Sequence, residues 1–126
     1  MPKKILLIDD EAGFTELLKM NLERAGDYEV CIENDSTKAH ATARAFRPDA
    51  ILLDVVMPGL DGGDVQAQLQ ADPLLVGIPV VMLTALVDST ELSEGAVAQA
   101  GSQMVLPKPV NLELLLKVIE EIMAAA

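Results

Sequence analysis

The chain has 126 residues, with 20 acidic and 9 basic side chains that give a net charge of −11 at pH 7. Residues 1–126 suit a single domain, and a hydrophobic content of 51% is too high for a chain that stays unfolded. The negative charge repels phosphodiester backbones and anionic lipids, which argues against nucleic acid or membrane as a direct partner. The single cysteine and the lack of a long apolar run predict a cytoplasmic protein without disulfides.

Short apolar runs alternate with helical patterns along the whole chain. Most of the apolar runs show no polar alternation, which is typical of strands covered on both faces. The predicted strands are Lys4–Ile8, Tyr28–Glu33, Ala50–Leu53, Ile78–Leu83 and Met104–Leu106.

Five helices are predicted between and after these strands. The first and last have clear apolar faces, which run from Phe14 to Ala25 and from Leu112 to Met123. The other three helices are Ser36–Phe46, Gly63–Ala71 and Ser89–Ala100, the last of which has the least apolar surface. Ser36 is a predicted N-cap, and Gly26 and Gly101 are predicted C-caps. This alternation predicts an α/β fold with a doubly wound, five-stranded parallel sheet.

Polar side chains follow four of the predicted strands, at the sheet edge where open parallel sheets bind ligands. Three carboxylates, one hydroxyl and one ammonium group are therefore expected at one edge. They belong to Asp9 and Asp10 after the first strand, Asp54 after the third, Thr84 with Ala85 after the fourth, and Lys108 after the fifth.

Each of these residues has a structural explanation when taken alone. Asp10 could cap the following helix, Lys108 could be a solvated surface lysine, and Thr84 alone indicates nothing. The combination is more informative, because like charges about 4 Å apart repel by several kcal/mol at an effective dielectric near 20. Such a cluster needs a cation, and ligands that are all oxygen atoms favour Mg²⁺.

The order and spacing of these residues resemble the receiver domain of bacterial response regulators. The matching segments are Asp9-Asp10, Asp54 with the loop from Met57 to Gly62, Thr84-Ala85 and Lys108-Pro109. The resemblance covers nearly the whole chain. It implies a flavodoxin-like sheet with strand order 2-1-3-4-5, the order of that family.

The resemblance also implies the function of a signalling switch and not of an enzyme. Asp54 would accept a phosphoryl group from a sensor histidine kinase or phosphotransfer protein, and the output partner is not specified. Lys108, Thr84 and the Ala85 backbone N–H would hold phosphoryl oxygens. Lys108-Pro109 would be a cis peptide. Mg²⁺ would be held by Asp10, Asp54 and the Val56 carbonyl, with Asp9 acting directly or through water.

Three positions bear on how such a switch would work, and one of them departs from the family pattern. Val105 stands where family members usually carry an aromatic residue whose rotation reports phosphorylation. The sequence therefore offers no aromatic rotamer at this position to report phosphorylation. Val56 and Leu86 stand two residues after Asp54 and Thr84, and neither side chain orients water. We therefore expect slow self-dephosphorylation.

Other classes of protein fit the sequence less well. A phosphatase of the haloacid-dehalogenase type needs Asp-x-Asp where this chain has Asp9-Asp10-Glu11, and a flavodoxin-like electron carrier needs a phosphate cradle and aromatic residues that are missing. The main alternative is a receiver-like adaptor that binds proteins regardless of phosphorylation. His40 is interpreted as a surface helix residue, and Cys31 as a small buried hydrophobic residue.

Overall fold

The computed structural model describes residues 2–85, 98–100, 103–108 and 110–125. Its strands are β1 (Lys3–Ile8), β2 (Tyr28–Glu33), β3 (Ala50–Asp54), β4 (Val80–Thr84), β5 (Ala98–Ala100) and β6 (Gln103–Pro107). Its helices are α1 (Ala12–Ala25), the 3-10 helix η1 (Ser36–Lys38), α2 (Ala39–Phe46), α3 (Gly62–Ala71) and α4 (Leu112–Ala125).

The sheet contains the five parallel strands that the sequence predicts, in the order β2-β1-β3-β4-β6. Counted as the predicted strands, this order is 2-1-3-4-5, so the predicted fold class is confirmed. One further strand, β5, pairs antiparallel with β6 at the edge of the sheet. The observed strand bounds differ from the predicted ones by at most two residues at either end.

The predicted fourth helix, Ser89–Ala100, is wrong at its last three residues. Residues 89–97 and its predicted C-cap Gly101 lie outside the described residues, and Ala98–Ala100 form β5. In this position the backbone pairs with the outer edge of β6, from Gln103 to Val105, and these pairs replace helical hydrogen bonds. The described ranges therefore contain four α-helices, one fewer than the sequence predicts.

The predicted second helix begins differently from the expectation. Ser36 is not its N-cap, because the Asp35 side chain caps η1 by accepting the N–H of Thr37 at 3.0 Å. The Ser36 hydroxyl instead contacts the loop after β3, at Pro58. Gly26, by contrast, takes the predicted C-cap position of α1.

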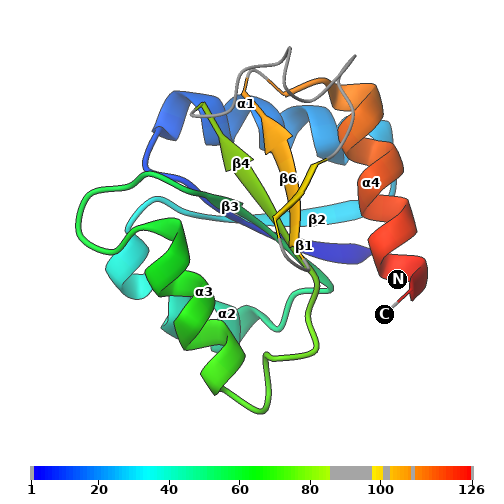
Figure 1. Cartoon of the computed structure of the whole chain (residues 1–126). Helices are drawn as coiled ribbons and strands as arrows, with labels where there is room; N and C mark the ends of the chain where they lie inside the picture. Colours follow the sequence, from blue (N-terminus) through cyan, green and yellow to red (C-terminus); the bar gives the residue numbers. More distant parts are fainter. Residues whose placement is uncertain (1, 86–97, 101–102, 109, 126) are drawn as a thin grey trace.

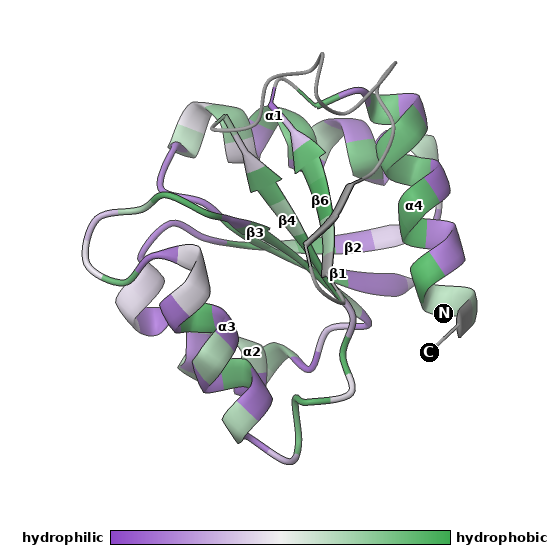
Figure 2. Ribbon diagram, in the orientation of Figure 1, coloured by the Kyte–Doolittle hydropathy of each residue, from purple (hydrophilic) through white to green (hydrophobic). Residues whose placement is uncertain are grey.

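Helices cover both faces of the sheet and leave the apolar strands between them. α1 and α4 lie on one face, and α2 and α3 lie on the other (Figure 1). The strands β4 and β6 at the centre of the view are mainly hydrophobic, whereas the helices carry both hydrophobic and hydrophilic residues (Figure 2). In β1, Ile5 and Leu7 join the core under α1 and α4, whereas Leu6 and Ile8 join the core under α2 and α3. This alternation explains why the central strands are apolar throughout.

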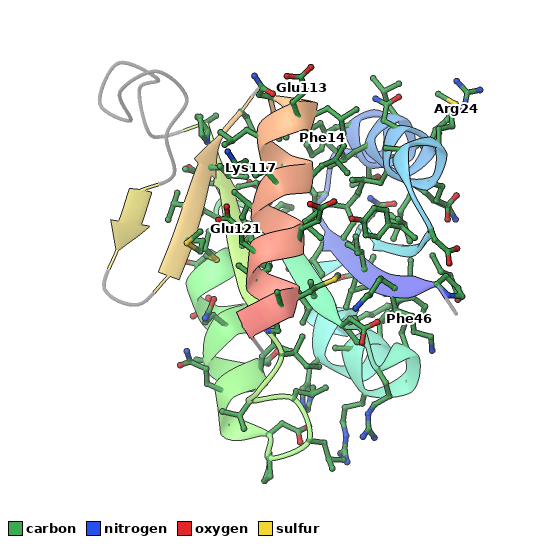
Figure 3. All side chains as sticks on the ribbon, turned by 90° about the vertical axis from the view of Figure 1, so that its right-hand side faces the viewer. Phe14, Arg24, Phe46, Glu113, Lys117 and Glu121 are labelled. Atoms are coloured by element: carbon green, nitrogen blue, oxygen red, sulfur yellow. The ribbon has the colours of Figure 1, made fainter. Side chains whose placement is uncertain are left out.

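The last helix, α4, packs across the sheet beside β6 (Figure 3). Leu115, Val118 and Ile119 are its buried residues. Glu113 and Lys117 are exposed on α4 and four residues apart, a spacing at which opposite charges attract on a helix. Among the described residues, no helix has the length and apolarity needed to span a membrane.

Candidate functional site

The parallel strands place the predicted site residues at one edge of the sheet. Asp54 and Thr84 are the last residues of β3 and β4, and Asp9 and Lys108 directly follow β1 and β6. Asp9 is fully buried, Asp54 is 5% exposed and Thr84 is 3% exposed. Asp10, one residue further along, is exposed. The edge therefore combines two buried carboxylates with one that faces solvent.

Lys108 lies at the centre of this acidic edge, with a side chain that is 12% exposed. Its Nζ is 2.6 Å from Asp9 Oδ2, 3.1 Å from Glu11 Oε1 and 3.5 Å from Asp54 Oδ1. The backbone fixes the base of this side chain, because the Lys108 N–H donates to the Thr84 carbonyl oxygen at 2.9 Å. One ammonium group thus faces carboxylates from two strands at once.

The aromatic ring of Phe14 covers the same ammonium group from α1. Lys108 Nζ lies 4.6 Å from the centre of the ring, within the range of a cation–π contact. Phe14 belongs to α1 and lies beside the start of α4 (Figure 3). The ring therefore restricts the positions that the lysine can take.

Burial and neighbouring charge change the protonation of the central pair. Burial, and then the nearby Asp9 carboxylate, raise the pKa of Asp54, whereas Lys108 acts in the opposite direction. Burial alone would lower the pKa of Lys108, but hydrogen bonds to Asp9 and Glu11, together with the negative charges of Asp9 and Asp54, outweigh it and raise that pKa. The lysine is therefore charged at neutral pH, and the Asp54 carboxylate is less stable than a solvated one.

We expect Asp54→Asn to stabilise the metal-free protein at neutral pH. A raised pKa means that the folded state binds more protons than the unfolded chain, so wild-type stability falls as pH rises from about 4 through the folded pKa of Asp54. Asparagine does not titrate, so it avoids this loss, which we expect to be about 1 kcal/mol. Urea unfolding in EDTA should show the gain at about pH 7 and a smaller one near pH 4. Equal stability at neutral pH would contradict the expectation.

The loop after Asp54 is closed by a tight contact between β3 and α3. The Gly62 N–H donates to the Val55 carbonyl oxygen at 2.8 Å, and Asp61 and Asp64 form a capping box at the start of α3. A Cβ atom on Gly62 would lie 2.5 Å from the backbone oxygen of Asp54. This position therefore requires glycine, because α3 begins directly against the backbone of Asp54.

A cavity of about 350 Å³ opens beside the acidic edge. It is lined by Asp10, Glu11, Asp54, Val56, Ala85 and Lys108. Carboxylate oxygens of Asp9, Asp10 and Asp54 lie within 4.8 Å of one another. This set of oxygen donors fits a hard divalent cation such as Mg²⁺, and the cavity leaves room for further ligands.

Several residues singled out in the sequence lie away from the acidic edge or outside the described residues. Leu86 and Pro109, and with Pro109 the predicted cis peptide, lie outside the described residues. Val105 is half-buried and packs against the core under α2 and α3. Cys31, predicted to be a small buried hydrophobic residue, packs against the core under α2 and α3 but is only half-buried, because β2 is an edge strand.

His40 lies apart from the acidic edge, in agreement with its interpretation as a helix residue without a role there. Its Nε2 is 2.9 Å from Asp72 Oδ2, and Arg44 Nε is 3.3 Å from the same oxygen. These residues line a hollow of about 660 Å³ that also includes Leu74. This hollow is larger than the one beside Asp54, but none of the acidic residues of the edge lines it.

Sequence reasoning assigned no role to three residues that shape the site. Glu11 contacts Lys108, and its place directly after the acidic pair was an available signal. Gly62 was recognised as part of the family loop, but its contact with Asp54 was not. Phe14 is predicted only as part of the apolar face of a helix. No sequence pattern connects it to Lys108, which lies 94 positions later in the chain.

Comparisons with known proteins agree with this arrangement. A family model described as response regulator receiver domain matches residues 5–120. The DNA-binding response regulator MtrA of Mycobacterium tuberculosis is 37% identical over 113 residues, which cover 89% of this chain and 48% of that protein. The phosphate regulon transcriptional regulatory protein PhoB of Pseudomonas aeruginosa is 40% identical over 108 residues, which cover 85% of this chain and 45% of that protein.

A solved structure with a similar fold is that of the chemotaxis protein CheY4 of Vibrio cholerae. It has a TM-score of 0.80 and 30% identity, and the match covers 97% of this chain and 99% of that one. The fold and the site thus define a signalling domain of the two-component type. The chain belongs to the response regulator receiver domain family. It spans about half the length of the curated relatives it matches.

Proposed function

We propose that this receiver domain accepts a phosphoryl group on Asp54 from a phosphohistidine of a sensor histidine kinase or phosphotransfer protein. The observation that carries the proposal is the position of the Asp54 carboxylate. It ends β3 in a cavity, 3.5 Å from the Lys108 ammonium and beside the carboxylates of Asp9 and Asp10. A nucleophile, a counter-charge and a set of cation ligands therefore share one opening.

In the proposed reaction, a carboxylate oxygen of Asp54 attacks the phosphorus in line with the bond to the donor histidine. The new O–P bond forms an acyl phosphate, while the N–P bond breaks and the imidazole leaves with its electron pair and takes up a proton. Asp54 is suited to this role because its carboxyl group ends β3 inside the cavity, where Lys108 favours the carboxylate form against the effect of burial, which raises its pKa. The Val56 N–H donates a hydrogen bond that orients the carboxylate.

Lys108, Thr84 and Ala85 would stabilise the transferred group. The Lys108 ammonium group is already 3.5 Å from the Asp54 carboxylate. It therefore needs only a small shift away from Asp9 to reach an oxygen of a phosphoryl group carried by Asp54. Thr84 ends the neighbouring strand, and Ala85 lines the same cavity. A hydroxyl, a backbone N–H and an ammonium group would then each hold one phosphoryl oxygen.

Asp10, Asp54 and the Val56 carbonyl, with Asp9 directly or through water, would hold Mg²⁺ at this site. When bound, the ion supplies positive charge that offsets the phosphoryl oxygens during transfer. Asp10 is exposed and adds its carboxylate to the two buried ones, so it gives a solvent-side ligand. Asp9 is already paired with Lys108, which is consistent with a less direct role.

Asp10→Ala should weaken Mg²⁺ binding at least about tenfold, because a ligand of the ion is lost. The fold should stay intact, since the Asp10 side chain is exposed. Isothermal titration with Mg²⁺ checks this expectation. Asp27→Asn is a matched control, because it removes one exposed carboxylate outside the site. Equal Mg²⁺ affinity of the Asp10→Ala protein and the wild type would contradict the assignment.

The apolar side chain at Val56 should make the phosphorylated state long-lived. Val56 is 57% exposed and lines the cavity beside Asp54, where it offers an attacking water no hydrogen bond. We therefore expect Val56→Asn to speed loss of the phosphoryl group at least about tenfold, because positioning effects of this kind reach orders of magnitude. The check is the decay of the phosphorylated proteins in Mg²⁺ buffer. Equal decay rates would show that Val56 does not limit hydrolysis.

An adaptor that acts regardless of phosphorylation is the alternative, and it predicts different behaviour. Binding that is independent of phosphorylation does not require a lysine that is paired with two buried carboxylates beside an open cavity. Such an adaptor would bind its partner equally well with Asp or Asn at position 54. The phosphorylation switch predicts that binding to a partner changes when Asp54 is phosphorylated.

A further inference from the structure

Ser36 connects the short helix η1 to the loop that follows Asp54. Its Oγ donates to the carbonyl oxygen of Pro58 at 2.9 Å and accepts the N–H of Leu60 at 3.0 Å. Ser36 is 3% exposed, so water does not easily replace these two bonds. A single hydroxyl therefore holds the loop on both sides of Gly59.

Gly59 shows how closely the loop lies against η1. Its φ angle is +83°, a left-handed conformation that favours glycine. A Cβ atom at Gly59 would lie 3.3 Å from Thr37 Cγ2 and 3.4 Å from Ser36 Oγ. The turn between Pro58 and Leu60 thus depends on Ser36 for its hydrogen bonds and on glycine for its backbone conformation.

The segment that carries Ser36 is itself held in place. Asp35 Oδ1 accepts from the Thr37 N–H at 3.0 Å and from the Thr37 hydroxyl at 2.6 Å. One residue earlier, Asn34 Nδ2 donates to the carbonyl oxygen of Asp9 at 2.7 Å. Residues 34–37 therefore connect the acidic end of β1 to the loop after β3.

We propose that Ser36 is a positioning residue for the cation site. By holding Pro58 and Leu60, it restricts the backbone of the loop to which Val56 belongs, so that the carbonyl ligand of Val56 is preorganised. This inference rests on the proposed function, because it assumes that the Val56 carbonyl is a Mg²⁺ ligand. Removing the hydroxyl should cost Mg²⁺ affinity although Ser36 is not a ligand.

The test compares Ser36→Ala with a conservative variant and a matched control. Ser36→Thr keeps the hydroxyl. Thr42→Ala removes a different hydroxyl, which donates to Glu33 Oε1 at 2.6 Å and does not contact the loop. Two quantities are measured on each full chain: Mg²⁺ affinity by titration, and hydrogen exchange of the Leu60 amide by NMR without metal. The second measurement does not depend on any activity of the protein.

We expect Ser36→Ala to raise the dissociation constant for Mg²⁺ about tenfold, as is typical when a residue that supports a metal ligand is removed. Exchange of the Leu60 amide should also become faster, because its acceptor is lost. Thr42→Ala should change neither quantity, and Ser36→Thr should stay near the wild type. If Ser36→Ala unfolds, Ser36→Cys provides the same comparison, because the thiol still fills the position of the hydroxyl but donates and accepts hydrogen bonds only weakly.

Two results would overturn the inference, and they can be told apart. If the wild type and Ser36→Ala bind Mg²⁺ equally well while Leu60 exchange accelerates, the hydroxyl holds the loop but does not position the ligand. If the wild type itself binds no Mg²⁺, the proposed function fails and the inference fails with it.

Discussion

Asp54→Asn is expected to lose Mg²⁺-dependent phosphoryl labelling at least about 100-fold, because the amide is not a nucleophile. The substitution nearly preserves the size of the side chain, and Asp54 is only 5% exposed, so packing should change little. Labelling with acetyl phosphate and Mg²⁺, followed by intact mass measurement, checks this expectation.

The control for this experiment is Asp27→Asn, which makes the same chemical change at an exposed position away from the site. It should be labelled like the wild type. Labelling of Asp54→Asn at the wild-type level would show that another residue accepts the phosphoryl group. The contacts of Lys108 with the Asp54 carboxylate would then be structural only.

Gly62→Ala should destabilise the protein by about 3 kcal/mol, because the new methyl group meets backbone atoms and cannot displace them easily. The added Cβ would lie 2.5 Å from the Asp54 oxygen and 2.8 Å from Val55 Cα. Relief of this clash moves the start of α3 away from Asp54, so the variant should also be labelled more slowly. Urea unfolding and the rate of labelling are the two measurements.

Gly13→Ala is a control with the opposite expected sign. Gly13 is also near the start of a helix, α1, but a Cβ atom there would meet nothing within 4 Å. The usual helix preference for alanine should therefore stabilise this variant by about 0.5–1 kcal/mol. If Gly62→Ala were as stable as Gly13→Ala, the close approach of α3 to Asp54 would not constrain the sequence.

The parallel sheet could be predicted because its strands are buried on both faces. Ile5 to Ile8 in β1 are fully buried, and no polar residue interrupts the run. The antiparallel strand β5 could not be predicted in this way. Ala98–Ala100 has no strand pattern, and its pairing depends on the free edge of β6, which is a tertiary contact.

The site could be predicted because strand order determines which residues share an edge. Once five parallel strands are assigned, Asp9, Asp54 and Lys108 must end near one another. The surrounding contacts are harder to predict. Serine is a favoured N-cap residue, but the neighbouring Asp35 caps the helix instead of Ser36. The Ser36 hydroxyl therefore forms hydrogen bonds with Pro58 and Leu60. Choices of this kind depend on which competing hydrogen bond the folded chain allows.

The most direct test of the account is the chemical nature of the group that forms on Asp54. After incubation of the wild type with acetyl phosphate and Mg²⁺, we predict one adduct of about 80 Da on the peptide that contains Asp54. Hydroxylamine should remove it, because an acyl phosphate is an activated carboxyl group, and EDTA during labelling should prevent it. An adduct on another peptide, one that survives hydroxylamine, or one that forms equally well in EDTA would contradict the assignment of Asp54 as a Mg²⁺-dependent phosphoryl acceptor.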